Sequence, residues 1–202
     1  MIERTFWHVR ASLVALAALL MLLGGCTSQS KRNKSTELST LAKPHIQVNV
    51  ARQLLILYTE DGHRRVYPIS TGKQGVGQQA GSLQTPLGKH VIIDKVGDGL
   101  PWNAIYKHGI FTGKYYSQKQ SGGREDPILS RIIRLAGTEK GFNLGEDVDT
   151  ESRRIYIHGT PPSERPQDRI PLSRGCIRMD VNHIIDLYQR APLGTHVEIK
   201  EK

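Results

Sequence analysis

Short runs in which apolar and polar residues alternate recur along the chain after residue 43. Residues 45–50 (HIQVNV) alternate strictly, and residues 195–199 (THVEI) do so again close to the C-terminus. A period of two is typical of half-buried β-strands. Further short apolar runs, several bounded by turn residues, predict strands at 54–58, 65–69, 89–93 and 154–157. The fold class predicted from this pattern is mainly β, a sandwich or barrel-like body.

Two segments have helical spacing instead. Residues 128–136 (ILSRIIRLA) carry apolar residues at helical spacing and precede Gly137, which predicts a short helix. Residues 180–190 predict a second helix, with Asp180 as its cap and apolar residues at 184, 185 and 187. Residues 97–123 combine scattered aromatic residues with many glycines, and their pattern predicts neither helix nor strand.

The N-terminus carries an apolar run of another kind. Residues 11–23 are apolar except for Ser12, and they follow a segment in which Arg4 and Arg10 outnumber Glu3. A basic start and an apolar run too short to cross a bilayer together predict a secretory signal. The run ends in Leu23-Gly-Gly-Cys26, which resembles the lipobox of bacterial lipoproteins. The alternative is an ordinary signal peptide with a chance cysteine.

The lipobox resemblance implies a signal peptide over residues 1–25 and a lipidated Cys26 as the mature N-terminus. Thr27, not aspartate, follows the cysteine, which in proteobacterial lipoproteins implies sorting to the periplasmic side of the outer membrane. Residues 26–43 are polar and predict a flexible tether to a domain at 44–202. The net charge of +9 favours an anionic partner such as a cell wall or membrane surface, and export argues against nucleic acid.

The chain has two cysteines. If Cys26 is lipidated, Cys176 has no intramolecular partner and becomes a candidate nucleophile. His158 follows the predicted strand 154–157, and Cys176 lies shortly before the predicted helix from Asp180. A helix start favours a thiolate, and a nearby histidine can accept the thiol proton. The amides of Gly175 and Cys176 are candidates for an oxyanion hole. The alternative is a buried structural cysteine.

The motif around these residues is more specific than the residue types alone. His158-Gly159-Thr160 precedes Ser173-Arg174-Gly175-Cys176-Ile177-Arg178 by a short loop. This pattern, with Thr85-Pro86-Leu87-Gly88 upstream, resembles the signature of the L,D-transpeptidase (YkuD-like) catalytic domain over about residues 44–200. One position departs from it, because Arg174 stands where the family often has histidine. A proton-relay role of that histidine therefore does not carry over.

The resemblance implies a role for each matching residue. Cys176 attacks the carbonyl of the third residue of a peptidoglycan stem peptide, and His158 accepts the thiol proton and protonates the leaving D-Ala. The Gly159 carbonyl orients the His158 ring, and Ser173 holds the turn that carries Cys176. Arg178 and Arg174 are candidates for pairing with a substrate carboxylate. The acyl group then passes to an amine, with no cofactor, and residues 97–150 correspond to a variable insertion.

Three other interpretations remain open. A hydrolase would hand the same acyl group to water, and the motif does not separate it from a transferase. A non-catalytic wall-binding lipoprotein would not need Cys176 and His158. A zinc site is disfavoured, because Cys176 and His158 supply two ligands where a structural site has four, and His183 lies on the following predicted helix.

Overall fold

The computed structural model describes residues 43–117, 127–164 and 166–202 of the chain. The predicted signal peptide, Cys26 and all but the last residue of the predicted tether lie outside the described residues. Within the described residues, no helix is long and apolar enough to cross a membrane.

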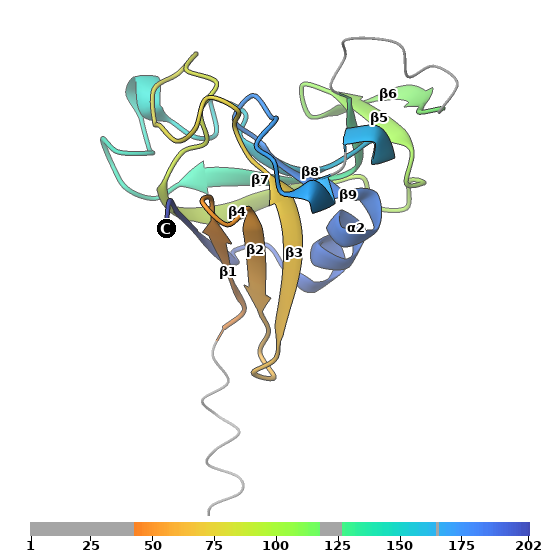
Figure 1. Cartoon of the computed structure of the whole chain (residues 1–202), viewed down its shortest axis with the longest axis horizontal. Helices are drawn as coiled ribbons and strands as arrows, with labels where there is room; N and C mark the ends of the chain where they lie inside the picture. Colours follow the sequence, from red (N-terminus) through yellow and green to blue (C-terminus); the bar gives the residue numbers. More distant parts are fainter. Residues whose placement is uncertain (1–42, 118–126, 165) are drawn as a thin grey trace, which may run out of the picture. The chain divides into compact units, whose positions relative to one another are not determined.

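Most of the regular secondary structure in the described chain is β-strand, as the sequence pattern predicted (Figure 1). The strands are β1 (His45–Asn49), β2 (Leu54–Tyr58), β3 (Arg64–Ser70), β4 (Gly88–Val96), β5 (Ala104–Lys107), β6 (Ile110–Tyr115), β7 (Ile128–Gly137), β8 (Tyr156–Thr160), β9 (Ile177–Asp180) and β10 (His196–Lys200). One α-helix, α2 (Val181–Arg190), and three short 3₁₀ helices, η3 (Glu146–Val148), η4 (Pro162–Glu164) and η5 (Pro166–Asp168), complete the described elements.

The sheet closes on itself. Its strand order is β4-β10-β1-β2-β3-β9-β8-β7-β5-β6, and an additional pairing between β4 and β7 completes a ring of eight strands. The β5–β6 hairpin is attached outside this ring, to the part of β7 that β4 leaves unpaired. Closure removes the exposed edges that an open sheet of this size would present. The fold is therefore the barrel-like form of the predicted mainly β class.

Strands β1 and β2 show how the alternating sequence builds the interior. Their burial patterns alternate residue by residue, so Ile46 and Val48 on β1 face the same core as Leu55 and Leu57 on β2. Helix α2 begins after Asp180, whose side chain accepts a hydrogen bond from the Asn182 backbone N–H at 2.8 Å. The predicted cap and the predicted apolar face of this helix are confirmed.

The prediction of a helix at residues 128–136 was wrong, because the segment is the central strand β7. Helix α2 covers one side of this strand, and the buried residues point to both of its faces. A strand that is buried on both faces loses the alternation of apolar and polar residues. A register shift between Leu129 and Ile132, where Ser130 has a φ of 69°, also breaks the period of two. The spacing of apolar residues along 128–136 therefore resembled that of a helix although the segment is a strand.

Strand β8 lies two residues later than predicted. The sequence pattern predicted a strand at 154–157, and the structure begins it at Tyr156 and continues it to Thr160. His158 consequently lies within the strand, where all five residues are buried, and not after its end.

A buried histidine makes the stability of this fold sensitive to acid. His90 on β4 is fully buried, and its Nδ1 and Nε2 atoms lie 3.0 Å from the Gly88 carbonyl oxygen and 3.2 Å from the Thr150 hydroxyl. Burial lowers the pKa of His90 to about 4. Between pH 6.5 and about 4, the histidine is protonated in the unfolded chain but stays neutral in the folded protein. Protonation therefore favours the unfolded chain as the pH falls, and the stability that neutral His90 contributes above pH 6.5 is lost through this window.

We expect the loss to be on the order of 3 kcal/mol in the free energy of unfolding. The His90→Gln variant, whose amide does not titrate, should lose less stability than the wild type between pH 6.5 and pH 4. Urea unfolding at several pH values measures this difference. Parallel stability curves for the two proteins would show that His90 is not the acid-sensitive group.

Candidate active site

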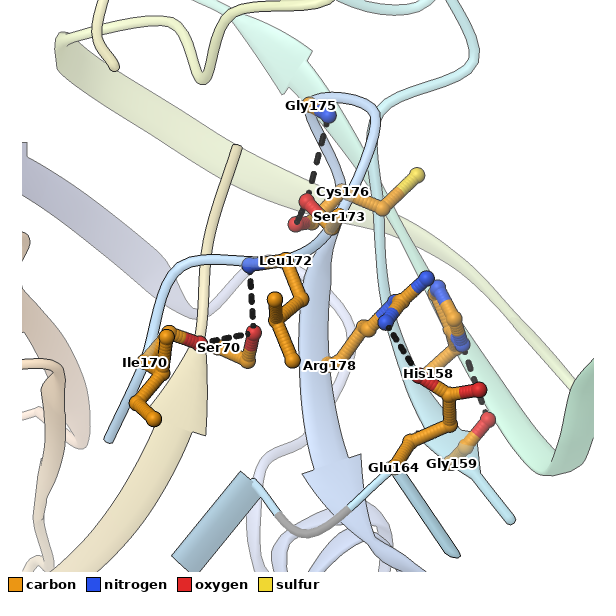
Figure 2. Close-up of polar contacts among 10 residues, drawn as sticks. All are labelled: Ser70, His158, Gly159, Glu164, Ile170, Leu172, Ser173, Gly175, Cys176 and Arg178. Atoms are coloured by element: carbon orange, nitrogen blue, oxygen red, sulfur yellow. Dashed lines mark hydrogen bonds and ion pairs between the residues drawn. The ribbon is translucent and has the colours of Figure 1, made fainter. Parts of the chain in front are cut away.

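The pairing of β8 with β9 brings the predicted site residues together. These two strands are parallel neighbours, and His158 and Arg178 are register partners across them. Cys176 comes two residues before Arg178, which places it toward the same face of the sheet because side chains alternate along a strand. Figure 2 shows the Cys176 thiol, the His158 ring and the Arg178 side chain on one side of these strands. Residues almost twenty positions apart in sequence thus share one site.

His158 is held in one orientation by the backbone. Its side chain is buried, and Nδ1 lies 2.8 Å from the Gly159 carbonyl oxygen. Because a carbonyl only accepts, Nδ1 must carry the proton in this hydrogen bond, and the lone pair of the neutral ring is then on Nε2. Figure 2 shows that the other edge of the ring is on the side of Cys176. The contact is the one that an orienting Gly159 carbonyl would make, and the role itself stays a prediction.

The Cys176 thiol is half-buried at the start of β9. It donates to the Arg154 carbonyl oxygen at 3.4 Å and packs against a small cluster that contains Tyr106 and Tyr156. Helix α2 begins after Asp180 as predicted, but its N-terminus is too far from Cys176 to favour the thiolate. All of β9 separates it from the first residue of α2, and the field of a helix falls off within its first turn. Any stabilisation of the thiolate must come from another group.

A tight turn presents the thiol. Ser173 is buried, and its hydroxyl donates to the Cys176 carbonyl oxygen at 2.5 Å and accepts from the Gly175 N–H at 3.1 Å. Gly175 has a φ of 111°, and a Cβ added to it would lie 2.9 Å from the Gln84 carbonyl oxygen. Only glycine fits this turn without strain. Ser173 thus bonds two backbone groups of the turn, and its role in presenting the nucleophile stays a prediction.

The same contacts change the expectation for the oxyanion hole. The Gly175 amide is engaged by Ser173 in this structure, so it does not point at an open position. To bind a developing oxyanion it would have to exchange that hydrogen bond for one to the substrate.

The two arginines of the motif lie in different environments. Arg178 is 4% exposed, and its Nη1 forms an ion pair with Glu164 of η4 at 3.1 Å. Arg174 is exposed and lines a cavity of about 450 Å³, whose wall also includes Arg153, Ile155, Glu146 and Asp147. The structure therefore brings Arg178 next to His158, whereas Arg174 lines a hollow that it shares with Arg153.

Three more residues lie against the nucleophile turn, of which the sequence had indicated only Thr85, as part of the Thr-Pro-x-Gly element. Thr85 is fully buried, and its hydroxyl donates to the Gly175 carbonyl oxygen and accepts from the Gly72 N–H, both at 2.9 Å. Tyr156 packs with Cys176, and Arg153 bonds the loop behind Gly175. The Thr-Pro-x-Gly element was a usable signal for Thr85, whereas nothing in the local sequence of Tyr156 or Arg153 marks them.

The β8–β9 connection is tied to the barrel at Ser70, the last residue of β3. The Ser70 hydroxyl donates to the Ile170 carbonyl oxygen at 2.6 Å and accepts from the Leu172 N–H at 3.0 Å. Figure 2 shows these two bonds below the nucleophile turn. They fix the segment that leads into Ser173. Within the described parts of the chain, no group of three or more histidine, cysteine or acidic residues is arranged to hold a metal ion.

Comparisons with known proteins agree with the motif. The family model described as the L,D-transpeptidase catalytic domain, YkuD, matches residues 43–199. A Bacillus subtilis protein named "Putative L,D-transpeptidase YqjB" is 27% identical over 161 residues, which cover 78% of this chain and 72% of that protein.

Solved structures show a weaker likeness. An L,D-transpeptidase from Mycobacterium smegmatis is 17% identical with a TM-score of 0.48, over 79% of this chain and 59% of that one. L,D-transpeptidase 3 from Mycobacterium tuberculosis, in complex with a faropenem-derived adduct, is 17% identical with a TM-score of 0.48, over 78% and 61%. The chain thus spans about three fifths of each of these structures.

Proposed function

Because this chain belongs to the L,D-transpeptidase catalytic domain (YkuD) family, we propose that it transfers acyl groups between peptidoglycan stem peptides with Cys176 as its nucleophile. The observation that carries the proposal is the pairing of β8 with β9. It puts an imidazole of fixed tautomer and the thiol on one face of the sheet. A thiol and a base arranged in this way are the components of covalent acyl transfer.

In the proposed mechanism His158 Nε2 accepts the Cys176 proton, and the thiolate attacks the carbonyl of the third stem residue. The imidazolium returns a proton to the leaving amine as the bond to D-Ala breaks, and a thioester remains on Cys176. An acceptor amine then attacks the thioester and loses a proton to His158. The C–S bond breaks as the new amide forms, and the released Cys176 thiolate takes the proton back from His158. The hydrogen bond from Nδ1 to the Gly159 carbonyl keeps the lone pair of the ring on Nε2 and disperses the positive charge on the imidazolium.

The products distinguish this proposal from its alternatives. The purified chain is incubated with a disaccharide-tetrapeptide, and the products are identified by mass. A dimer that has lost one D-Ala, with a 3→3 link, supports the transferase. Tripeptide without dimer supports a hydrolase that uses the same acyl-enzyme. Recovery of the unchanged tetrapeptide would contradict both and favour a wall-binding protein without catalysis.

The proposal includes a lipid anchor at Cys26 on the periplasmic side. The support for it is the sequence Leu23-Gly-Gly-Cys26 after an apolar run. Labelled fatty acid should be incorporated into the wild-type chain and not into Cys26→Ala, and the anchored wild type should fractionate with the outer membrane. Equal labelling of the two proteins would contradict the anchor and would leave the chemistry at Cys176 untouched.

We predict that Arg178 contributes to substrate binding. Its guanidinium lies beside His158 and is charged, so the Arg178→Ala variant should raise KM for the tetrapeptide donor about tenfold or more. The matched control is Glu164→Gln, which removes the ion-pair partner and keeps the arginine. Steady-state kinetics and thermal melting should be measured for both variants. If Arg178→Ala melts much earlier but the folded enzyme keeps normal kinetics, Arg178 serves only the fold.

A further inference from the structure

The thiolate of Cys176 needs a source of positive charge that the helix start does not supply. Arg153 is in a suitable place. It lies in the turn before β8, is half-buried, and is followed directly by Arg154, whose carbonyl oxygen accepts from the Cys176 thiol at 3.4 Å. Arg154 itself has a φ of 58°. Left-handed backbone at a residue other than glycine is strained and is concentrated at functional sites.

The Arg153 side chain reaches behind the nucleophile turn. Its Nη1 donates to the carbonyl oxygens of Gly77 and Gln78 at 3.2 Å and 2.6 Å, and its Nη2 donates to that of Gln84 at 2.7 Å. The Gln84 carbonyl oxygen is the atom that lies 2.9 Å from a Cβ built on Gly175. The Gln84 carbonyl group therefore lies between the Arg153 guanidinium and Gly175, the residue that precedes Cys176.

This cation is balanced by carbonyl dipoles and not by an acid. Within residues 43–117, 127–164 and 166–202, no carboxylate lies within ion-pair distance of the Arg153 guanidinium. Burial lowers the pKa of Arg153, and attraction to the Cys176 thiolate opposes that shift. A guanidinium remains charged in proteins, so a partly desolvated positive charge lies behind the turn that carries the thiol. Such a charge favours the thiolate over the thiol.

We infer that Arg153 is a positioning residue for the nucleophile: it holds loop 77–84 against the Gly175 turn and stabilises Cys176 as the thiolate. This inference rests on the proposed role of Cys176 as nucleophile. It assigns to one arginine the electrostatic task that the sequence had suggested for a helix start.

Other charged or titratable groups also lie on the elements around Cys176. They are Arg154 before β8, Tyr156 and His158 on β8, Arg178 on β9, Arg174 in the same turn, and Tyr106 on β5. All of these are unchanged when Arg153 alone is replaced. A change in thiol ionisation in such a variant therefore reports on Arg153.

The test measures the rate of alkylation by iodoacetamide against pH in the full chain with Cys26→Ser, so that Cys176 is the only thiol. Arg153→Met removes the charge and keeps the length of the side chain. It should move the alkylation midpoint to higher pH and slow the reaction about tenfold below the wild-type midpoint. Arg52→Met is the matched control, because it removes one exposed positive charge next to β2 and should leave the profile unchanged.

Arg153→Lys keeps the positive charge but loses the guanidinium hydrogen bonds. It therefore separates the effect of charge from an effect of reduced folding stability. Its alkylation midpoint should stay close to that of the wild type even if its melting temperature falls, because an ammonium can still face the thiol. A wild-type midpoint in Arg153→Met would overturn the electrostatic role, as would a midpoint in Arg153→Lys near the free-thiol value of about 8.5. Alkylation needs no wall substrate, so either result is independent of whether the chain turns over stem peptides.

Discussion

Replacing Cys176 with alanine should leave a folded, normally located protein that neither cross-links nor hydrolyses stem peptides. In the proposed mechanism both reactions pass through the same thioester on Cys176, so both should be lost together. Removal of a nucleophile from a serine protease lowers kcat on the order of 10⁶-fold, and the small remaining rate comes from binding and oxyanion contacts. The product assay with disaccharide-tetrapeptide, run to the detection limit, measures the loss.

Folding should be preserved in Cys176→Ala, because the thiol is half-buried and packs only at the side of the small cluster around Tyr106 and Tyr156. Circular dichroism and melting check this. Cys26→Ala is the complementary variant, since it should change location and keep the chemistry. If Cys176→Ala turned over tetrapeptide like the wild type, Cys176 would be only a packed thiol and the proposed mechanism would be wrong.

The sequence predicted most of the strands because their chemistry is local. Where one face of a strand meets the core and the other is less buried, as in β1 and β2, the period of two is visible without the structure. The Asp180 cap is equally local, because its side chain bonds a backbone amide two residues away. The motif around His158 and Cys176 was readable for another reason: its spacing resembles a family signature.

The errors lie where neighbours far away in the sequence decide the structure. Strand β7 lost its alternation because the main core buries Ile133 and Leu135, while a second cluster around Tyr106 and Tyr156 buries Ile132. The prediction of a helix-start field at Cys176 failed because β9 forms by pairing with β8, which the residues 177–180 alone do not indicate. Thr85 reaches Gly175, and Arg153 reaches the adjacent Gln84, only after the loops have folded. The Thr-Pro-x-Gly element draws attention to Thr85, whereas no short pattern marks Arg153.

Replacing His158 with glutamine should remove the general base. The Nδ1 of His158 donates to the Gly159 carbonyl oxygen at 2.8 Å, and glutamine fills the place of the ring with a neutral amide. The amide has no basic lone pair with which to accept the thiol proton. Acylation by the tetrapeptide donor should therefore fall about 10²–10⁴-fold, the contribution typical of a positioned acid–base group.

The matched control is His63→Gln, which changes an exposed histidine in the β2–β3 turn and should leave acylation unchanged. Single-turnover acylation followed by intact mass gives the rate of thioester formation without the acceptor step.

The pH dependence of this rate separates two possible causes of slow acylation, the loss of the base and a change in the shape of the site. If His158 is the base, the variant should regain rate as the pH rises and hydroxide deprotonates the thiol directly, because only the route to the thiolate has been lost. A variant that is equally slow at every pH would show that His158 shapes the site without moving the proton, and a variant as fast as the wild type would place the base elsewhere.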